Sequence, residues 1–378
     1  MELTKCKLGE LITQRREKND GSDLPICGVS KDGLIPPKQK DADTSIYNVF
    51  YRDDFIFNPA RMELNSIAIN DMYDRAICSS LYEVFYVHRT DLLLPHYLKL
   101  IIRQKWFTRY CEFLGQGSAR EYCRFSNISE IEIEFPPIEE QQKIVDYNTA
   151  IENRIALKQK INDNLANTEQ LILHQAISKN QTVPLSLNEI AEFIDGDRGK
   201  NYPTFDEFST SGFCLFLNAS NVTSSGFNFD SCMFVTEEKD KIMRNGHLLL
   251  NDIVFTSRGT LGNVALYDKN IKYKNVRINS GMLIIRPKGI NLSPYFIYAL
   301  LKSNYMKSAI EQFRSGSAQP QLPIKDLQNI TFDIPESQNV LDDLEHRFFK
   351  IEETISINKR EIGNLNELTS VLLARLSR

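Results

Sequence analysis

The clearest pattern in the chain is a run of apolar residues at alternating steps of three and four near the C-terminus. It begins at Leu341 and continues over five heptads, with Asn358 and Thr369 as polar members. A repeat of this period is typical of a coiled-coil seam. An earlier stretch has the same frame more weakly, and no proline interrupts either one. The predicted seam residues are Ile144, Ile151, Ile155, Leu165 and Ile172 in the first helix, and Leu344, Phe348, Ile351, Ile355, Ile362, Leu365 and Leu372 in the second.

Polar residues occupy equivalent places in the two seams. Lys158 falls in the first helix where Asn358 falls in the second. Polar seam residues reduce stability but fix the register of paired helices. They either serve as such register devices or face a bulge or solvent, and the sequence does not decide between these two readings.

The segments before the two helices resemble each other. GSAREYCRFSNISEIEIEFP from Gly117 and GSAQPQLPIKDLQNITFDIP from Gly316 share their first three residues, their apolar spacing and the final proline, at an offset of 199. The offset becomes 200 within the helices, and it is 179 between LGELI from Leu8 and LNEIA from Leu187. A period near 200 is too long for a solenoid repeat. The pattern therefore indicates the duplication of a whole unit, a globular domain followed by a long helix.

The globular parts read as mixed helix and strand. SSLYEVFYV from Ser79, NDIVFT from Asn251 and GMLIIRP from Gly281 are rich in β-branched and aromatic residues and are predicted as strands. We therefore predict an α/β (α+β) fold with two similar globular domains that alternate with two long paired helices. The predicted boundaries are 1–137 and 180–335 for the domains, and 138–179 and 336–378 for the helices.

Composition favours an ordinary soluble protein, with 42% hydrophobic and 25% charged residues. No apolar run is long enough to span a membrane, and the first residues lack the apolar core of a signal peptide. The seven cysteines include no C-x-x-C pair, which favours reduced thiols and argues against a structural zinc site. We expect a cytoplasmic protein with no membrane partner and no bound metal.

The net charge of −4 does not by itself indicate a nucleic-acid partner. Residues 138–178 and 336–378 each carry a net charge of −2, so the rest of the chain is together neutral. Within them, basic residues gather near turns among Gly, Ser, Asn and Gln, which suits phosphate and base-edge contacts; alternatively, they are simply solvated. The basic residues concerned are Arg120, Arg124, Arg198, Lys200, Lys241, Arg244, Lys269, Lys272, Lys274, Arg277 and Arg314.

Motifs for catalysis are absent. The chain has no phosphate-binding G-x-x-x-x-G-K-[ST] loop, and NPAR from Asn58 is not the pattern of an amino-methyltransferase. Asp230, Glu237 and Lys239 superficially resemble a metal-dependent nuclease site, but the other copy has no counterpart. These observations favour a protein that is not itself an enzyme.

Three features resemble the specificity subunits of type I restriction–modification systems. They are the two-copy pattern, the Gly-Ser-Ala turn followed by a strand that ends in proline, and FPPIEEQQKIV from Phe135 at the start of the first helix. NDIVFTSRGTLG from Asn251 also resembles the interior of the family's domains. The first domain departs from this pattern because RDDFIFNPARM lacks the Arg-Gly-Thr-x-Gly turn of residues 258–262, which leaves Arg61 as the candidate counterpart of Arg258.

The resemblance implies a mechanism. Each globular part would be a target-recognition domain that reads one half of a bipartite, asymmetric site in double-stranded DNA. The helices would pair antiparallel about a pseudo-two-fold axis and hold the domains apart. At about 1.5 Å per residue the helices reach roughly 60 Å, which limits the half-site separation to roughly 18 base pairs.

The same resemblance implies the partners. Two modification subunits would supply S-adenosylmethionine-dependent adenine methylation, and restriction subunits would add ATP- and Mg-dependent translocation and cleavage. This chain would hold no cofactor of its own. Two other readings stay open, a coiled-coil adaptor that binds protein and a degenerate nuclease that uses Asp230, Glu237 and Lys239.

Candidate DNA contacts lie on the turns. Gln319 is suited to adenine and Arg120 to guanine. The Gly-Ser-Ala segments can equally be tight turns that need glycine only for the backbone. The candidates are Arg258, Gly259, Thr260, Ser317, Gln319 and Arg314 in the second copy, Ser118, Arg120, Arg124 and Arg61 in the first, and Arg198 with Lys200.

Overall fold

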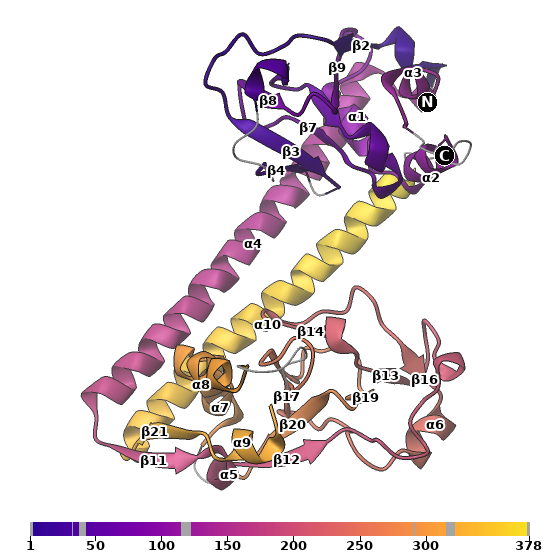
Figure 1. Ribbon diagram of the computed structural model, residues 1–378. Helices are drawn as coiled ribbons and strands as arrows, with labels where there is room; N and C mark the ends of the chain where they lie inside the picture. Colours follow the sequence, from indigo (N-terminus) through magenta and orange to yellow (C-terminus); the bar gives the residue numbers. More distant parts are fainter. Residues whose placement is uncertain are drawn as a thin grey trace. The chain divides into compact units, whose positions relative to one another are not determined.

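The chain forms two compact units. The computed structural model describes residues 3–31, 33–37, 43–114, 122–289, 292–314 and 322–375. One unit contains residues 1–156 with 363–378, and the other contains residues 157–362 (Figure 1). We call the globular part of the first unit the first domain (3–135) and that of the second unit the second domain (182–335). Each domain has its own buried apolar core.

The first domain contains two four-stranded sheets and a two-stranded ribbon. One sheet has the order β2-β9-β6-β7, the other β4-β3-β8-β5, and β1 pairs with β10 in the ribbon. The strands are β1 (Thr4–Lys7), β2 (Ile12–Arg15), β3 (Ile26–Ser30), β4 (Gly33–Ile35), β5 (Asn48–Tyr51), β6 (Phe55–Phe57), β7 (Ile67–Ile69), β8 (Arg75–Cys78), β9 (Glu83–Val87) and β10 (Glu132–Phe135). The helices are η1 (Leu8–Glu10), η2 (Thr44–Ile46), η3 (Pro59–Leu64), α1 (Pro95–Ile102), α2 (Lys105–Leu114) and α3 (Phe125–Ser129).

The second domain has the corresponding elements with a longer middle. Its main sheet has the order β12-β20-β17-β18, beside a three-stranded sheet β16-β13-β19 and two two-stranded ribbons, β11-β21 and β14-β15. The strands are β11 (Thr182–Ser186), β12 (Ala191–Asp195), β13 (Cys214–Phe216), β14 (Val222–Thr223), β15 (Gly226–Phe227), β16 (Phe234–Val235), β17 (Ile253–Thr256), β18 (Val264–Leu266), β19 (Val276–Arg277), β20 (Met282–Pro287) and β21 (Thr331–Pro335). The helices are α5 (Leu187–Ile190), η4 (Phe205–Glu207), η5 (Ala219–Asn221), α6 (Glu237–Ile242), α7 (Pro294–Lys302), α8 (Asn304–Arg314) and α9 (Ile324–Gln328).

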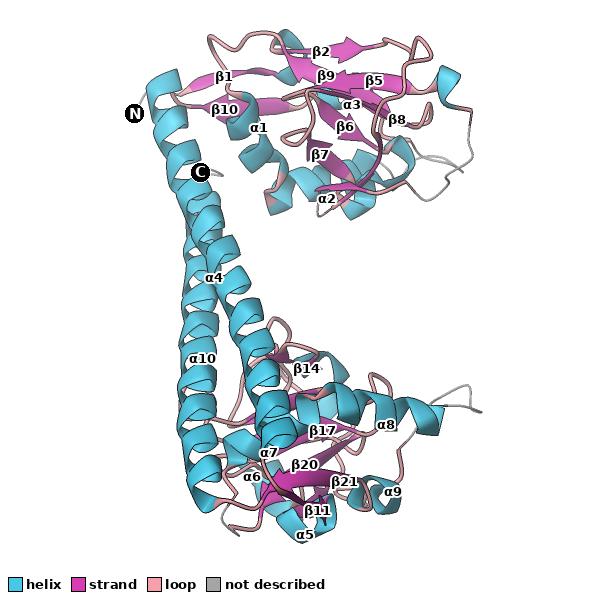
Figure 2. Cartoon of the chain, turned by 90° about the vertical axis from the view of Figure 1, so that its left-hand side faces the viewer, coloured by secondary structure: helices cyan, strands magenta, loops and turns pink. Residues whose placement is uncertain are grey.

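The predicted duplication is confirmed by the topology. Strands β2, β9, β6 and β7 occur in the same order as β12, β20, β17 and β18, and each domain also has one parallel pair, β3 with β8 and β13 with β19. Helix α1 packs against β7, and α7 packs against β18 and β20 (Figure 2). The predicted mixed α/β fold is therefore correct, and residues of the two domains can be matched strand by strand.

A buried aspartate opens the same strand in both domains. Asp54 accepts the Tyr51 N–H at 2.8 Å, and Asp252 accepts the Leu249 N–H at 2.7 Å. In both, the preceding residue has a positive φ, 66° at Asp53 and 73° at Asn251. Since an unpaired buried carboxylate is costly, each aspartate also needs a cation.

The arginine that pairs with this aspartate differs between the domains. Arg15 of β2 binds Asp54 in the first domain, with Nε–Oδ2 at 2.6 Å, whereas Arg286 of β20 binds Asp252 in the second, with Nε–Oδ1 at 2.8 Å. The two domains thus share the turn with its aspartate, but the arginine that pairs with the aspartate lies on a different strand in each domain.

The two predicted long helices are α4 (Ile138–Lys179) and α10 (Gln338–Arg375). Lys158 Nζ lies 2.7 Å from Glu361 Oε2, and Asn358 Nδ2 donates to Asn162 Oδ1 at 2.8 Å. As the number rises along α4 it falls along α10, so the helices are antiparallel. Lys158 Nζ also donates to Asn358 Oδ1 at 2.9 Å. Lys158 and Asn358 therefore bond to each other across the pair, as register devices would, and do not face solvent.

The predicted seam residues are all buried or half-buried. At the ends of the helices, however, they join the cores of the domains. Leu344 and Phe348 belong to the core of the second unit, where Phe348 stacks on Phe296 with ring centroids 6.2 Å apart. Ile144 packs against the core of the first. The seam is therefore a coiled coil in its middle and a domain anchor at its ends.

The FPPIEEQQKIV string has a structural explanation in Gln141. Its side chain is fully buried, accepts the Leu94 N–H at 2.9 Å, and donates to the carbonyls of Leu92 and Pro136 at 2.7 and 2.8 Å. It thereby fixes the start of α4 to the segment that leads into α1.

Gln141→Leu is expected to destabilise the first unit by at least about 2 kcal/mol, because each buried polar group left unpaired costs about 1–3 kcal/mol. Urea unfolding of the full chain measures this change. Gln142→Leu, at the exposed neighbour that bonds only Asp146, is the matched control. Equal unfolding midpoints for the two variants would contradict this role of Gln141.

No helix among the described residues is long and apolar enough to cross a membrane. The same residues contain no group of three or more His, Cys, Asp or Glu side chains placed to hold a metal ion.

Candidate nucleic-acid interface

The turn between β17 and β18 presents three of the predicted DNA contacts. Arg258, Gly259 and Thr260 are all exposed. The backbone of the turn requires glycine, since Gly259 has a φ of +73° and Gly262 one of +88°. A side chain at Gly262 would also place its Cβ 2.7 Å from Ile310 Cδ1. The Arg-Gly-Thr-x-Gly pattern therefore builds a rigid turn that presents Arg258 to solvent.

A hollow of about 320 Å³ lies beside this turn. Three cations from three separate segments line it, Arg198 after β12, Arg258 after β17 and Lys325 in α9. Its other lining residues are Asp195, Ser257, Leu322, Pro323 and Ile324. The fold thus brings two predicted contacts, Arg198 and Arg258, to one place, and adds Lys325, which the sequence analysis missed.

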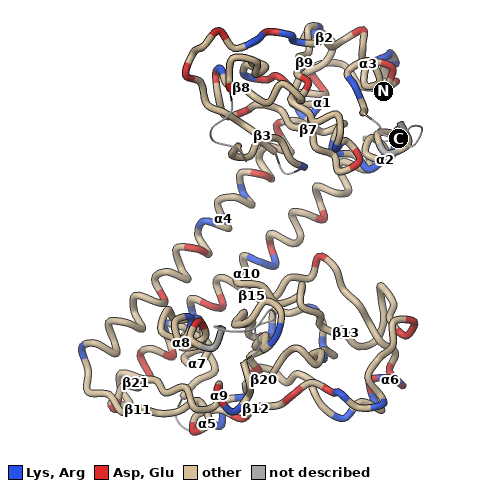
Figure 3. The backbone as a smooth tube through the Cα atoms, in the orientation of Figure 1, with Lys and Arg blue, Asp and Glu red and all other residues tan. Residues whose placement is uncertain are grey.

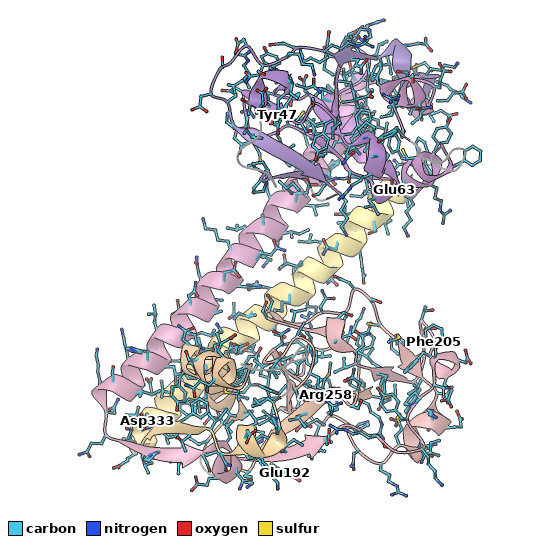
Figure 4. The ribbon with its side chains drawn as sticks, viewed as in Figure 1. Tyr47, Glu63, Glu192, Phe205, Arg258 and Asp333 are labelled. Carbon is cyan, nitrogen blue, oxygen red and sulfur yellow. The ribbon has the colours of Figure 1, made fainter. Side chains whose placement is uncertain are left out.

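The cations of this hollow differ in how they are paired. Arg198 Nη2 lies 3.0 Å from Asp195 Oδ2 and donates to the Ser280 carbonyl at 3.3 Å. Within the part of the chain that the structure describes, neither Arg258 nor Lys325 has an ion-pair or hydrogen-bond partner. Arg258 is labelled in Figure 4. Unpaired cations at a concave surface can donate hydrogen bonds to a phosphate or to the edge of a base.

The charge pattern elsewhere is mixed. Lys200, another predicted contact, is exposed two residues after Arg198. Arg277, one of the basic residues near turns, is instead buried and pairs with Asp240, with Nε–Oδ1 at 2.5 Å. Along α4 and α10, basic and acidic residues are interspersed (Figure 3).

The equivalent place in the first domain is marked by one backbone hydrogen bond. The Cys123 N–H donates to Pro59 O at 3.0 Å, as the Leu322 N–H donates to Ser257 O at 3.3 Å. Counted from this bond, Ala60 takes the place of Arg258, and Arg61 follows one residue later as an exposed side chain of η3. Arg61 is thus next to the counterpart position and not in it.

Arg124 is the other first-domain contact that the structure places. Its Cζ lies 5.5 Å from the centre of the Tyr122 ring, and its Nη1 lies 3.8 Å from Glu83 Oε1. It precedes α3 as Pro323 precedes α9, so the cation of this segment has moved between the copies.

Several predicted contacts fall outside the described residues. Ser118 and Arg120 lie in 115–121, and Ser317 and Gln319 lie in 315–321. Arg314 ends α8, but its side chain is not described.

The residues of the alternative nuclease site have separate partners. Glu237 Oε1 lies 2.7 Å from Lys241 Nζ, and Lys239 Nζ lies 2.8 Å from Glu207 Oε2. Asp230 lines a different hollow, beside Tyr273 and Phe229. These contacts hold Glu237 and Lys239 in surface ion pairs.

The chain thus has two domains of equal topology, each with exposed cations near the corresponding turn, and a pair of antiparallel helices. The model of the type I restriction modification DNA specificity domain matches residues 6–167 and 181–367. The chain belongs to this family and is a specificity subunit, the part of a type I system that recognises DNA and does not catalyse its modification or cleavage. The predicted family is confirmed.

Known relatives are distant in sequence. The MjaIX specificity subunit of Methanocaldococcus jannaschii is 22% identical over 303 residues, which are 76% of this chain and 69% of that protein. The type I S subunit from M. genitalium has a crystal structure with a TM-score of 0.63 and 17% identity, covering 99% of this chain and 96% of its own. The HsdS subunit from Thermoanaerobacter tengcongensis has a TM-score of 0.40 at 17% identity, with 99% and 96% coverage. The TM-score of 0.63 supports the duplicated fold.

Proposed function

We propose that each domain reads one half of a bipartite, asymmetric site in double-stranded DNA. The observation that carries this proposal is the combination of equal topology with unequal side chains. Arg258 and Lys325 of the second domain correspond to Ala60 and Ser126 of the first. One fold with two different sets of presented side chains is suited to two different base sequences.

The contacts follow from the chemistry of the hollow. Arginine recognises guanine through two hydrogen bonds to O6 and N7, and lysine and arginine bind phosphate oxygens. Arg258, with Gly259 and Thr260 in its turn, is placed to read bases, while Arg198, Lys200 and Lys325 hold the backbone. Arg61 and Arg124 serve the first domain. Ser118, Arg120, Arg314, Ser317 and Gln319 remain candidates on sequence grounds.

The helices are proposed to set the spacing of the half-sites. The domain boundaries stay at 1–137 and 180–335, with helices over 138–179 and 336–378 between and after them. Helix α4 has 42 residues, which gives a length of about 60 Å at about 1.5 Å per residue. The bonded group of Lys158, Asn162, Asn358 and Glu361 fixes the register, and with it the spacing.

The same helices are proposed to dock two modification subunits. Leu157 of α4 and Ile357 of α10 are both exposed, as are Leu171 and Val371, and each pair is separated by 200 residues. Equivalent exposed apolar residues on the two helices make two equivalent surfaces, which suits two copies of one partner. The modification subunits would bind S-adenosylmethionine, and restriction subunits would bind ATP and Mg. The complex would act in the cytoplasm.

The test is a methylation map. The chain is co-expressed with the methyltransferase subunit encoded beside it, and methylated adenines are mapped in the host genome. The expected result is a two-part asymmetric motif that disappears when this chain is deleted. A stable complex without any methylation motif would favour the protein-binding adaptor instead.

A further inference from the structure

The two reading surfaces differ in a systematic way. In the second domain the residues that flank 315–321 are Gln312 and, on the other side, Pro323 and Lys325. At an offset of 199 the first domain has Phe113, Arg124 and Ser126. Shared hydrogen bonds at the start of α3 and α9 establish this alignment, because Arg124 O accepts from Asn127 and Pro323 O accepts from Asp326. Phe113 thus stands where the second domain has the amide of Gln312, and Ser126 stands where it has Lys325, while Arg124 stands where it has Pro323.

Two aromatic side chains are exposed at this place in the first domain. Phe113 is 70% exposed in the last turn of α2, and Tyr122 is 47% exposed just before Cys123. Tyr122 corresponds to Gln321 of the second domain. Large exposed aromatic side chains cost solvation free energy, so a pair at one site indicates a contact surface.

Tyr122 contacts one candidate DNA contact of the first domain, and the helix that carries Phe113 packs against the element that carries another. Helix α2 packs against η3, which carries Arg61, and Cys123, next to Tyr122, bonds to Pro59 at the start of η3. Glu63 marks η3 in Figure 4. Because the Arg124 guanidinium lies over the Tyr122 ring, the surface combines aromatic faces with positive charge. That combination is suited to bases and sugars of a nucleic acid.

We infer that the two domains hold their half-sites by different physical means. The first domain holds its half-site through apolar and stacking contacts from Phe113 and Tyr122, while the second holds its half-site mainly through Arg198, Arg258 and Lys325. Apolar wedges that contact base edges and steps add affinity without releasing counterions. This inference rests on the proposed function and specifies the chemistry of each site.

The two mechanisms respond differently to salt. The double variant Phe113→Gln with Tyr122→Gln places the amides of the second domain in the first. In the complex with its partner subunits, we expect affinity for the mapped target duplex to fall roughly tenfold or more, because stacking on one ring contributes about 1–3 kcal/mol. The slope of log K against log salt concentration should stay unchanged, because no charge is removed. Phe205→Gln, at an exposed phenylalanine of the second domain, is the control (Figure 4).

The outcomes separate the inference from the proposed function. If the double variant has unchanged affinity, or loses affinity with a lower salt slope, the inference is overturned. The proposed function would still stand if replacing Arg198, Arg258 and Lys325 weakened binding. A complex that retains no duplex in a sequence-dependent way would overturn both. The single variant Phe113→Gln provides the same readout at a largely exposed position of α2, should the double variant fold poorly.

Discussion

Joint replacement of Arg198, Arg258 and Lys325 by glutamine is expected to weaken binding of the target duplex by two to four orders of magnitude. A good bidentate base contact contributes about 1–3 kcal/mol, and each phosphate contact adds about 0.9 to the salt slope on duplex DNA. The slope should therefore fall by up to about two, because Arg198 and Lys325 are the two proposed backbone contacts among the three residues. Titrations of the full complex at several salt concentrations measure both quantities.

Position within the hollow should matter more than charge alone. Lys241, Lys272 and Lys307 are exposed cations of the second domain outside the lining of the hollow, so changing all three to glutamine removes the same charge. This control should retain most of the affinity. Equal losses in the two triple variants would show that the hollow has no special role.

The specificity of methylation should change in one half of the motif only. With Arg258→Gln alone, the first half-site should persist while the second becomes less selective, because the domains read independently. Mapping methylated adenines in a strain that carries this variant tests the assignment. Loss of selectivity in both halves would contradict it.

Lys302→Met is expected to destabilise the second unit by about 3–5 kcal/mol, the usual cost of removing one partner from a buried ion cluster. Lys302 ends α7, and its ammonium lies 2.6 Å from Glu169 of α4 and in contact with Glu352 of α10. Both carboxylates are buried. Without the lysine, they would face each other with no cation. Thermal unfolding of the full chain at pH 8 measures the effect.

The cluster also makes stability depend on pH. Burial raises the pKa of Glu169 from 4.5 to about 8, against the attraction of Lys302 and with repulsion from Glu352. Between these two values the folded chain keeps a proton that the unfolded chain has released, so stability decreases as pH rises through this window. Below pH 4.5 the penalty is absent, because the side chain is protonated in both states.

Glu169→Gln isolates this contribution. The amide resembles the protonated carboxyl and does not titrate, so its stability advantage over the natural chain should grow from pH 5 to pH 8. The equivalent residue in α10 is Thr369, and Thr369→Val is the control that should show no such trend. A pH-independent difference between Glu169→Gln and the natural chain would exclude the raised pKa as its cause.

The anchoring of the two domains illustrates what duplication preserved. Arg103, the counterpart of Lys302, donates to Glu152 of α4 at 2.9 Å, and Glu152 matches Glu352. The first copy keeps this ion pair more exposed, because Thr369 provides no second carboxylate. The sequence offset alone aligned these residues, but burial and coupling became visible only in the folded chain.

The sequence by itself determined the elements with strong periodicity. Seam spacing predicted the two long helices that the structure shows as α4 and α10, since apolar residues at steps of three and four form one stripe to bury. The constant offset determined the duplication, and NDIVFT and GMLIIRP were correctly predicted as strands. These properties are local or repetitive, so they can be read along the chain.

Only the tertiary structure decided which polar residues act together. Arg198, Arg258 and Lys325 are far apart in sequence. Strands β12 and β17 both pair with β20, and the residues that follow these two strands line one hollow together with α9. Arg277 belongs, like Arg198, to the basic residues near turns in the sequence, yet it is buried against Asp240. Whether a cation is paired or presented depends on contacts between segments that sequence spacing does not encode, and in this chain that difference separates a structural arginine from a candidate reader of DNA.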